Sequence, residues 1–177
     1  MGQAGQVGRV GQVVATITGV TEALERAPAL VIPLVRQAPA ESLKRRPPSG
    51  KWSIHEHAVH LAEVHPLMLG RLDVMLMEDD PVIRSYDPGR DDPDDVLLQR
   101  DLEAVEQYAR DRVSLVERLR QLTEAEWRRT ARHDEYNSYS VFTMFRHLAL
   151  HDFFHAYRIE ELLLRAGWPA PLEWVLE

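Results

Sequence analysis

Histidines are the residues of this chain whose type and spacing could do chemistry. His147, His151 and His155 recur at every fourth position, and a helix places such positions on one stripe of its surface. The same predicted face carries four apolar residues, Met144, Leu148, Ile159 and Leu162. The three rings are therefore expected to point into a protein core, where neutral imidazole is a good ligand for zinc, nickel, copper or iron.

A second histidine-rich stretch lies far earlier in the chain. It contains four histidines, His55, His57, His60 and His65, whereas His133 falls in a predicted loop. His60 is placed to face inward with Val64 and Leu67. Two histidines four positions apart can reach one ion, and a third from a facing helix would leave one coordination position open for water or substrate. On the residues alone, hydrogen-bonded core histidines remain the alternative to a metal site.

Composition limits both the ligands and the class of protein. The chain has no cysteine, which excludes disulfides, thiolate ligands and a cysteine nucleophile. Its 177 residues, 45% hydrophobic and 28% charged, predict one globular domain over 1–177 with residues 1–12 flexible. A net charge of -7 argues against a nucleic-acid partner. No apolar run is long enough for a membrane span and the start lacks a signal peptide, so a cytoplasmic protein with no membrane partner is predicted.

The first two of four predicted long helices precede residue 78. The first spans about 12–37, and its two prolines, Pro28 and Pro33, are expected to kink or break it. The second spans about 53–77 and begins with a capping box, in which Ser53 and Glu56 each satisfy a backbone amide of the first turn. Pro66 interrupts the hydrogen-bond ladder of this second helix, so a local kink is expected there as well.

Two further long helices are predicted after an acidic loop at 78–92. One opens at the Asp-Pro-Asp-Asp segment and spans 92–122. A capping box then predicts a short helix over 123–130, and the last long helix spans 140–165 before Gly167 stops it. No segment shows a convincing alternating strand pattern. The expected fold is all-α, a four-helix bundle with long connections.

Two segments resemble the signatures of a known superfamily. Gly50-Lys-Trp-Ser-Ile-His-Glu-His-Ala-Val-His-Leu-Ala-Glu closely resembles the first signature of the DinB/YfiT-like superfamily, Trp-Ser followed by an acid or amide and then His-Leu. The segment His-Leu-Ala-Leu-His-Asp-Phe-Phe-His-Ala-Tyr-Arg-Ile, from residue 147, resembles its second signature, a paired HxxxH. The resemblance covers about 21–168 and implies the DinB/YfiT-like four-helix bundle.

Carried over position by position, the metal ligands of this superfamily fall on His60, His151 and His155. His65 stands where members often have Glu or His, so it is expected near the site without an assigned role. His147 is expected as a neighbour of the site and is the best substitute ligand. Pro66 and the glycine-rich start depart from the family pattern.

The resemblance also implies a divalent metal, with zinc or nickel expected, and a small-molecule substrate. Members include S-transferases that use bacillithiol or mycothiol, a maleylpyruvate isomerase and metal-dependent hydrolases. Two schemes remain open: the cation favours the thiolate of a low-molecular-weight thiol such as bacillithiol, or it activates water for hydrolysis. The alternative is a non-catalytic, stress-associated scaffold protein with structural histidines.

Several charged residues are candidates for supporting roles. Glu56 could orient His60, although capping explains it already. Glu63 and Asp152 could do the same, but exposed helix charges are the favoured interpretation. Arg158 could hold an anionic substrate or simply pair with Glu161.

The aromatic residues indicate how the core packs and where two copies of the chain associate. Trp52 and Trp168 are expected to be core or capping aromatics rather than platforms for a substrate. The last helix is also apolar opposite its histidines, at Phe142, Phe153, Tyr157 and Leu164. A helix that is apolar all round is buried, so a homodimer packed on this face is predicted.

Overall fold

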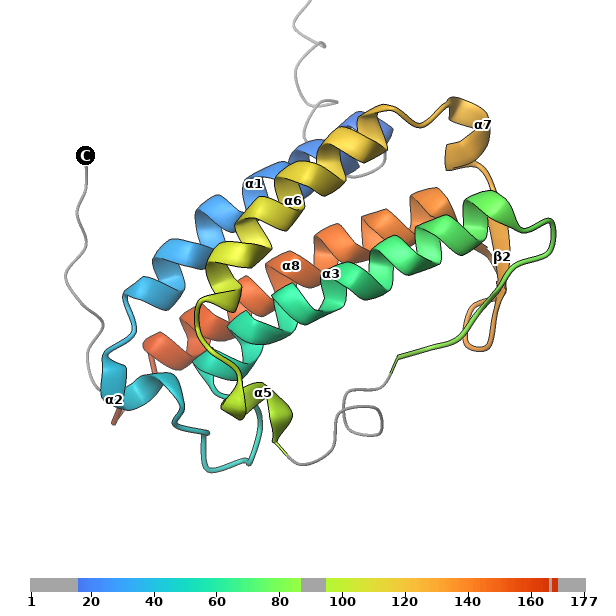
Figure 1. The fold of residues 1–177 in the computed structure, drawn as a ribbon. Helices are drawn as coiled ribbons and strands as arrows, with labels where there is room; N and C mark the ends of the chain where they lie inside the picture. Colours follow the sequence, from blue (N-terminus) through green and yellow to red (C-terminus); the bar gives the residue numbers. More distant parts are fainter. Residues whose placement is uncertain (1–15, 87–94, 166, 169–177) are drawn as a thin grey trace, which may run out of the picture.

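Four long helices form a bundle in the computed structural model, which describes residues 16–86, 95–165 and 167–168 (Figure 1). They are α1 (Ile17–Arg36), α3 (Ile54–Met77), α6 (Ala104–Arg120) and α8 (Val141–Leu163). The predicted all-α four-helix bundle is confirmed. The expected flexible lead-in at 1–12 and the expected helix opening at 92–94 lie outside the described residues. Within the described ranges, no helix is long and apolar enough to cross a lipid bilayer.

The direction of each helix follows from how the core divides into two clusters. One cluster joins the first halves of α1 and α8 to the last halves of α3 and α6, and the other cluster joins the opposite ends. α1 and α8 therefore run parallel to each other and antiparallel to α3 and α6. Each of α3 and α1 packs against both α6 and α8 (Figure 1). Because α3 and α6 run in the same direction, the connection between them returns along the length of the bundle.

Local capping signals set where the helices begin. The Thr16 hydroxyl accepts the Gly19 amide at 3.0 Å, and Ser53 and Glu56 form the predicted reciprocal capping box at the start of α3. α1 continues through both of its prolines and α3 continues through Pro66, so the first helix is not broken. Burial of one face of each helix outweighs the lost backbone hydrogen bonds, since most helical stability in proteins comes from packing.

The prediction of one continuous helix over 92–122 is wrong. A short helix α5 (Val96–Gln99) is separated from α6 by a stretch in which Arg100 is extended, at φ −66° and ψ 153°. The backbone carbonyl of Arg100 accepts a hydrogen bond from His55 Nε2 at 3.1 Å, and its side chain pairs with Glu63 at 3.2 Å. These contacts with α3 override the local helical preference.

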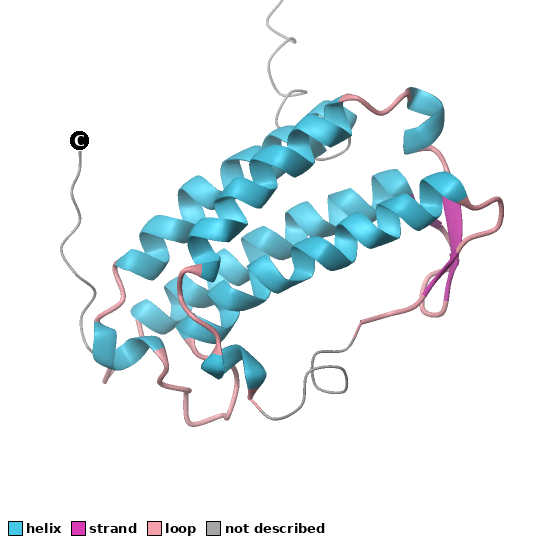
Figure 2. Ribbon diagram, viewed as in Figure 1, coloured by secondary structure: helices cyan, strands magenta, loops and turns pink. Residues whose placement is uncertain are grey.

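Short strands also form, contrary to the expectation of none. β1 (Val82–Ile83) pairs in parallel with β2 (Thr130–His133), which pairs antiparallel with β3 (Tyr139–Ser140) (Figure 2). The short helix α7 (Glu124–Trp127) therefore ends before Thr130, which opens β2; the remaining short helix is α2 (Ala40–Leu43). Strands of two to four residues are too short for an alternating pattern to be visible in sequence.

Candidate metal centre

Three histidine rings from two helices converge inside the bundle. His60 comes from α3, and His151 and His155 come from consecutive turns of α8. The Nε2 atoms of His60 and His151 lie 3.1 Å apart, and those of His155 and His151 lie 3.0 Å apart. One ligand atom of each ring lies within 4.8 Å of the other two. The structure thus brings together the three residues that the sequence indicated.

Burial keeps the rings of His60 and His155 neutral. His60 and His155 are each only 4% exposed. Burial, aided by the neighbouring His151 and His57, lowers the pKa of His60 to about 3. Burial and the neighbouring histidines also hold the pKa of His155 far below its usual value. A neutral imidazole offers one ring nitrogen with a free lone pair, so His60 and His155 each present a lone pair to a cation.

The donor set fits a divalent cation. Zinc–nitrogen bonds are about 2.0–2.1 Å long, so tetrahedral geometry places two bound nitrogens about 3.4 Å apart. The two Nε2 separations of 3.0 and 3.1 Å are close to that spacing. Within the described part of the chain, the buried Nδ1 atoms of His60 and His151 have no hydrogen-bond partner. Three imidazole ligands would leave the fourth coordination position of a tetrahedral ion open.

A fourth histidine, which sequence reasoning did not single out, supports the cluster from behind. The Nδ1 atoms of His57 and His155 lie 2.8 Å apart in the interior. If His155 uses Nε2 as a ligand atom, its Nδ1 carries the proton and donates a hydrogen bond to His57 Nδ1. Burial lowers the pKa of His57 to about 4, so this ring is also neutral and can accept. The signal in the sequence was its position three residues before His60 on the same helix.

Trp52 covers one side of the histidine rings. Its ring centroid lies 4.8 Å from that of His60 and 5.9 Å, nearly parallel, from that of His155. The indole therefore shields the cluster from water on that side, in addition to packing against the start of α3. Trp168 is not part of this cluster, and its ring stacks instead under the guanidinium of Arg45 at 4.5 Å.

Three of the four candidate supporting residues have other partners. Glu56 is buried, forms the capping box and pairs with Arg46, which agrees with its capping interpretation. Glu63 is exposed and pairs with Arg100. Arg158 pairs with Glu161 one turn along α8, which agrees with the ion-pair interpretation.

Asp152 is the exception, because it is fully buried rather than an exposed helix charge. Arg112 donates to both of its carboxylate oxygens at 2.8 Å, and the Tyr108 hydroxyl donates at 3.0 Å. Burial opposes ionisation, but the charge and hydrogen bonds of Arg112 hold the pKa of the carboxyl below its usual value. Asp152 Oδ1 lies 3.9 Å from His151 Nδ1. His65 belongs to this network, with Nδ1 at 3.5 Å from Arg112 Nη1, and not to the ring cluster.

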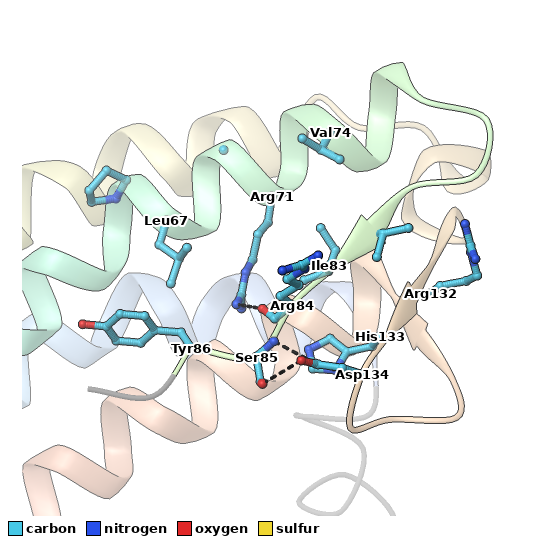
Figure 3. A pocket seen from close by; sticks show the side chains of 13 residues that line it. Leu67, Arg71, Val74, Ile83, Arg84, Ser85, Tyr86, Arg132, His133 and Asp134 are labelled. Carbon is cyan, nitrogen blue, oxygen red and sulfur yellow. Dashed lines mark hydrogen bonds and ion pairs between the residues drawn. The ribbon is translucent and has the colours of Figure 1, made fainter. Parts of the chain in front are cut away.

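A cavity of about 290 Å³ opens from the histidine cluster between α3 and α8. His147 lies in its wall, one turn before His151, and not in the cluster. Arg71 and Tyr139 line the part contributed by the end of α3 and by β3. The cavity shares Leu67 and other residues with a wider groove beneath β1 (Figure 3). A small molecule could therefore reach the open side of the cluster.

Comparisons with known proteins agree with this fold. Residues 23–159 match the model of the DinB superfamily, and the chain belongs to that superfamily. Among solved structures, YfiT from Bacillus subtilis is similar, with a TM-score of 0.78, 22% identity, and coverage of 87% of this chain and 89% of YfiT. YfiT is described as a probable metal-dependent hydrolase with an unusual four-helix bundle topology. No match was found among curated proteins.

Proposed function

We propose that His60, His151 and His155 hold one divalent metal ion and that the chain is a metal-dependent hydrolase of a small molecule. The observation that carries this proposal is the convergence of three histidine rings beside a cavity. Membership of the DinB superfamily supports it, as does the description of the similarly folded YfiT as a probable metal-dependent hydrolase. Zinc or nickel is the metal that we expect, since three imidazoles suit both ions.

Each group of the site has a physical role in this proposal. A bound divalent ion supplies Lewis acidity, which can lower the pKa of water to about 7. The three imidazoles hold the ion from two helices. His57 fixes the proton of His155 on Nδ1, and Trp52 keeps bulk water from one side. The cavity admits a substrate to the remaining side.

Metal analysis of protein purified without added metal tests the proposal. We expect about one zinc or nickel ion per chain, and its loss in a folded His151→Ala, His155→Ala double variant. His147→Ala is the matched control, because His147 lies on the same helix but outside the cluster, and it should keep the metal. Metal loss from the control but not from the double variant would contradict the assignment of ligands.

Assays of the metal-loaded protein distinguish the possible reactions. Hydrolysis of small esters or amides without any thiol supports a hydrolase. Activity that requires an added thiol such as bacillithiol would instead make the protein an S-transferase, whose sulfur must come from outside because the chain has no cysteine. A metal-free protein with unchanged stability and ligand affinity would favour the stress-associated scaffold role.

We also propose a homodimer that packs on the outer face of α8. Five large apolar side chains are exposed on this face, Leu150, Phe153, Phe154, Tyr157 and Leu164. Contiguous exposed apolar surface of this kind is typical of protein interfaces. Phe142, which was expected on the same face, packs instead against the core beside Trp127, with ring centroids 6.4 Å apart.

Two further proposals concern nucleic-acid binding and the cellular compartment of the protein. The net charge of -7 supports the absence of a nucleic-acid partner. The cysteine-free composition is compatible with the reducing cytoplasm, which is the compartment that we propose.

A further inference from the structure

We infer that the substrate carries a carboxylate, which Arg71 binds at the end of the cavity away from the histidine cluster. This inference rests on the proposed function for the role of the histidines. The anion site itself depends only on Arg71 and the walls around it.

Arg71 belongs to the same stripe of α3 as His60. Four residues at helical spacing, His60, Val64, Leu67 and Arg71, line the cavity. Eleven residues of helix span about 16 Å, and helical side chains lean toward the N-terminus. His60 and Arg71 therefore lie at opposite ends of this stripe. In Figure 3 its side chain extends from α3 to the segment that carries Arg84 and Ser85.

The guanidinium of Arg71 has unused capacity for an anion. Its Nη2 donates to the backbone carbonyl of Arg84 at 2.5 Å (Figure 3). Among the residues that the structure describes, no carboxylate pairs with Arg71, whereas Arg118 pairs with Asp73 and Arg132 with Asp80. A guanidinium carries five donors in a planar fork that matches the two oxygens of a carboxylate. The Tyr139 side chain is a second neighbour of this guanidinium, and the donors that Arg84 and Tyr139 leave unused are available to an anion in the cavity.

The charges around the cavity also favour an anion. In the described part of the lining, the exposed Glu135 is the one carboxylate, against Arg71 and five histidines. The backbone amide of Glu135 donates a hydrogen bond to His133 Nδ1 at 3.1 Å. A divalent ion at the cluster would add positive charge at the other end. Opposite charges attract more strongly in a partly buried site than in water.

The walls between these two ends are aromatic and apolar. The rings of Tyr136 and Tyr139 lie nearly parallel with centroids 5.9 Å apart, and His133 lies 4.5 Å from Tyr139. Met68 and Met144 complete the lining on this side. A volume of about 290 Å³ lies at the lower end of the range for ligand pockets, roughly 300–1,000 Å³. The site thus suits a small carboxylate with a flat or apolar body.

Binding of a matched pair of probes to the metal-free protein tests this inference. Benzoate and benzamide have the same shape but differ in charge, and we expect the wild type to prefer benzoate by roughly ten- to a hundredfold. Arg71→Gln should abolish this preference by weakening benzoate alone and leaving the affinity for benzamide unchanged. Arg84→Gln is the matched control, because Arg84 lines the outer groove but not the cavity. Chemical-shift titration measures all affinities.

Two outcomes would overturn the inference. One is a wild-type protein without preference for benzoate, which needs no variant to interpret. The other is a folded Arg71→Gln protein that keeps the preference; if this variant does not fold, Arg71→Lys replaces it and should lose at least part of the preference with the planar fork. A protein that prefers benzoate through Arg71 but binds no metal would instead reject only the proposed metal function.

Discussion

His155 lies between two other histidines, and each of its ring nitrogens faces one of them. Its Nε2 is 3.0 Å from His151 Nε2, and its Nδ1 is 2.8 Å from His57 Nδ1. A neutral imidazole has one protonated nitrogen, so the partner of Nδ1 decides whether Nε2 is free to bind a cation. His57 is therefore a positioning residue, because it acts on the proposed ion only through His155.

Replacing His57 is expected to weaken zinc binding without removing a ligand. His57→Leu leaves His155 Nδ1 without an acceptor and should lower zinc affinity about 10–100-fold. His57→Asn is the conservative variant, because the asparagine side-chain oxygen can stand near the position of Nδ1, and it should restore most of the affinity. Competition with a chromophoric chelator measures both. Equal losses in the two folded variants would show that His57 only fills space.

At the scale of the elements, a buried ion pair links helices that lie diagonally across the bundle. Arg112 of α6 and Asp152 of α8 are 1% and 0% exposed, and Tyr108 and His65 contact the same pair. The pair thus connects α3, α6 and α8 directly behind His151. Buried charges are tolerated only when each is paired and hydrogen-bonded, so these helices have a fixed relative position.

Breaking this pair is expected to destabilise the fold. Arg112→Leu leaves the Asp152 carboxylate buried and unpaired, and should lower the free energy of unfolding by about 3–5 kcal/mol. An Arg112→Leu, Asp152→Leu double variant should recover much of that loss, because no isolated charge remains. Urea unfolding of the two single variants and the double variant measures the coupling. Costs that simply add would contradict a direct interaction between the two side chains.

For the whole molecule, α8 carries two different surfaces. Its inner stripe supplies His151 and His155 to the site, while its outer stripe exposes Tyr157 at 63% and Phe154 at 56%. A bundle of four helices leaves one face of each helix at the surface, and here that face of α8 is apolar. Association through α8 would leave the cavity open, because the cavity lies between α8 and α3 on the other side.

Light scattering at micromolar concentration is expected to give about twice the chain mass of 20.3 kDa. Tyr157→Glu places a charge in the proposed interface and should yield monomers. Val113→Glu is the control, because Val113 is similarly exposed, at 59%, but lies on α6, diagonal to α8. A wild-type protein that is monomeric under these conditions would argue against the dimer.

The sequence by itself determined most of the long helices and, with the family resemblance, the three members of the histidine cluster. Capping signals such as Ser53 with Glu56 act within one turn, and an apolar stripe repeats within a few residues, so both are visible in a short window. The i, i+4 spacing of His151 and His155 is likewise visible within a short stretch of sequence. For His60 the sequence offers only an inward-facing position and the family resemblance, and the structure brings this ring to the other two.

Only the tertiary structure decided which distant groups meet. The break before α6, the pairing of β1 with β2, the burial of Asp152 against Arg112 and the place of Arg71 in the cavity all depend on contacts between segments far apart in the chain. Such contacts leave no periodic pattern in a single sequence, because each depends on a partner that lies far away along the chain. Packing of the helices gives these residues their neighbours, and with them their charge state and their role.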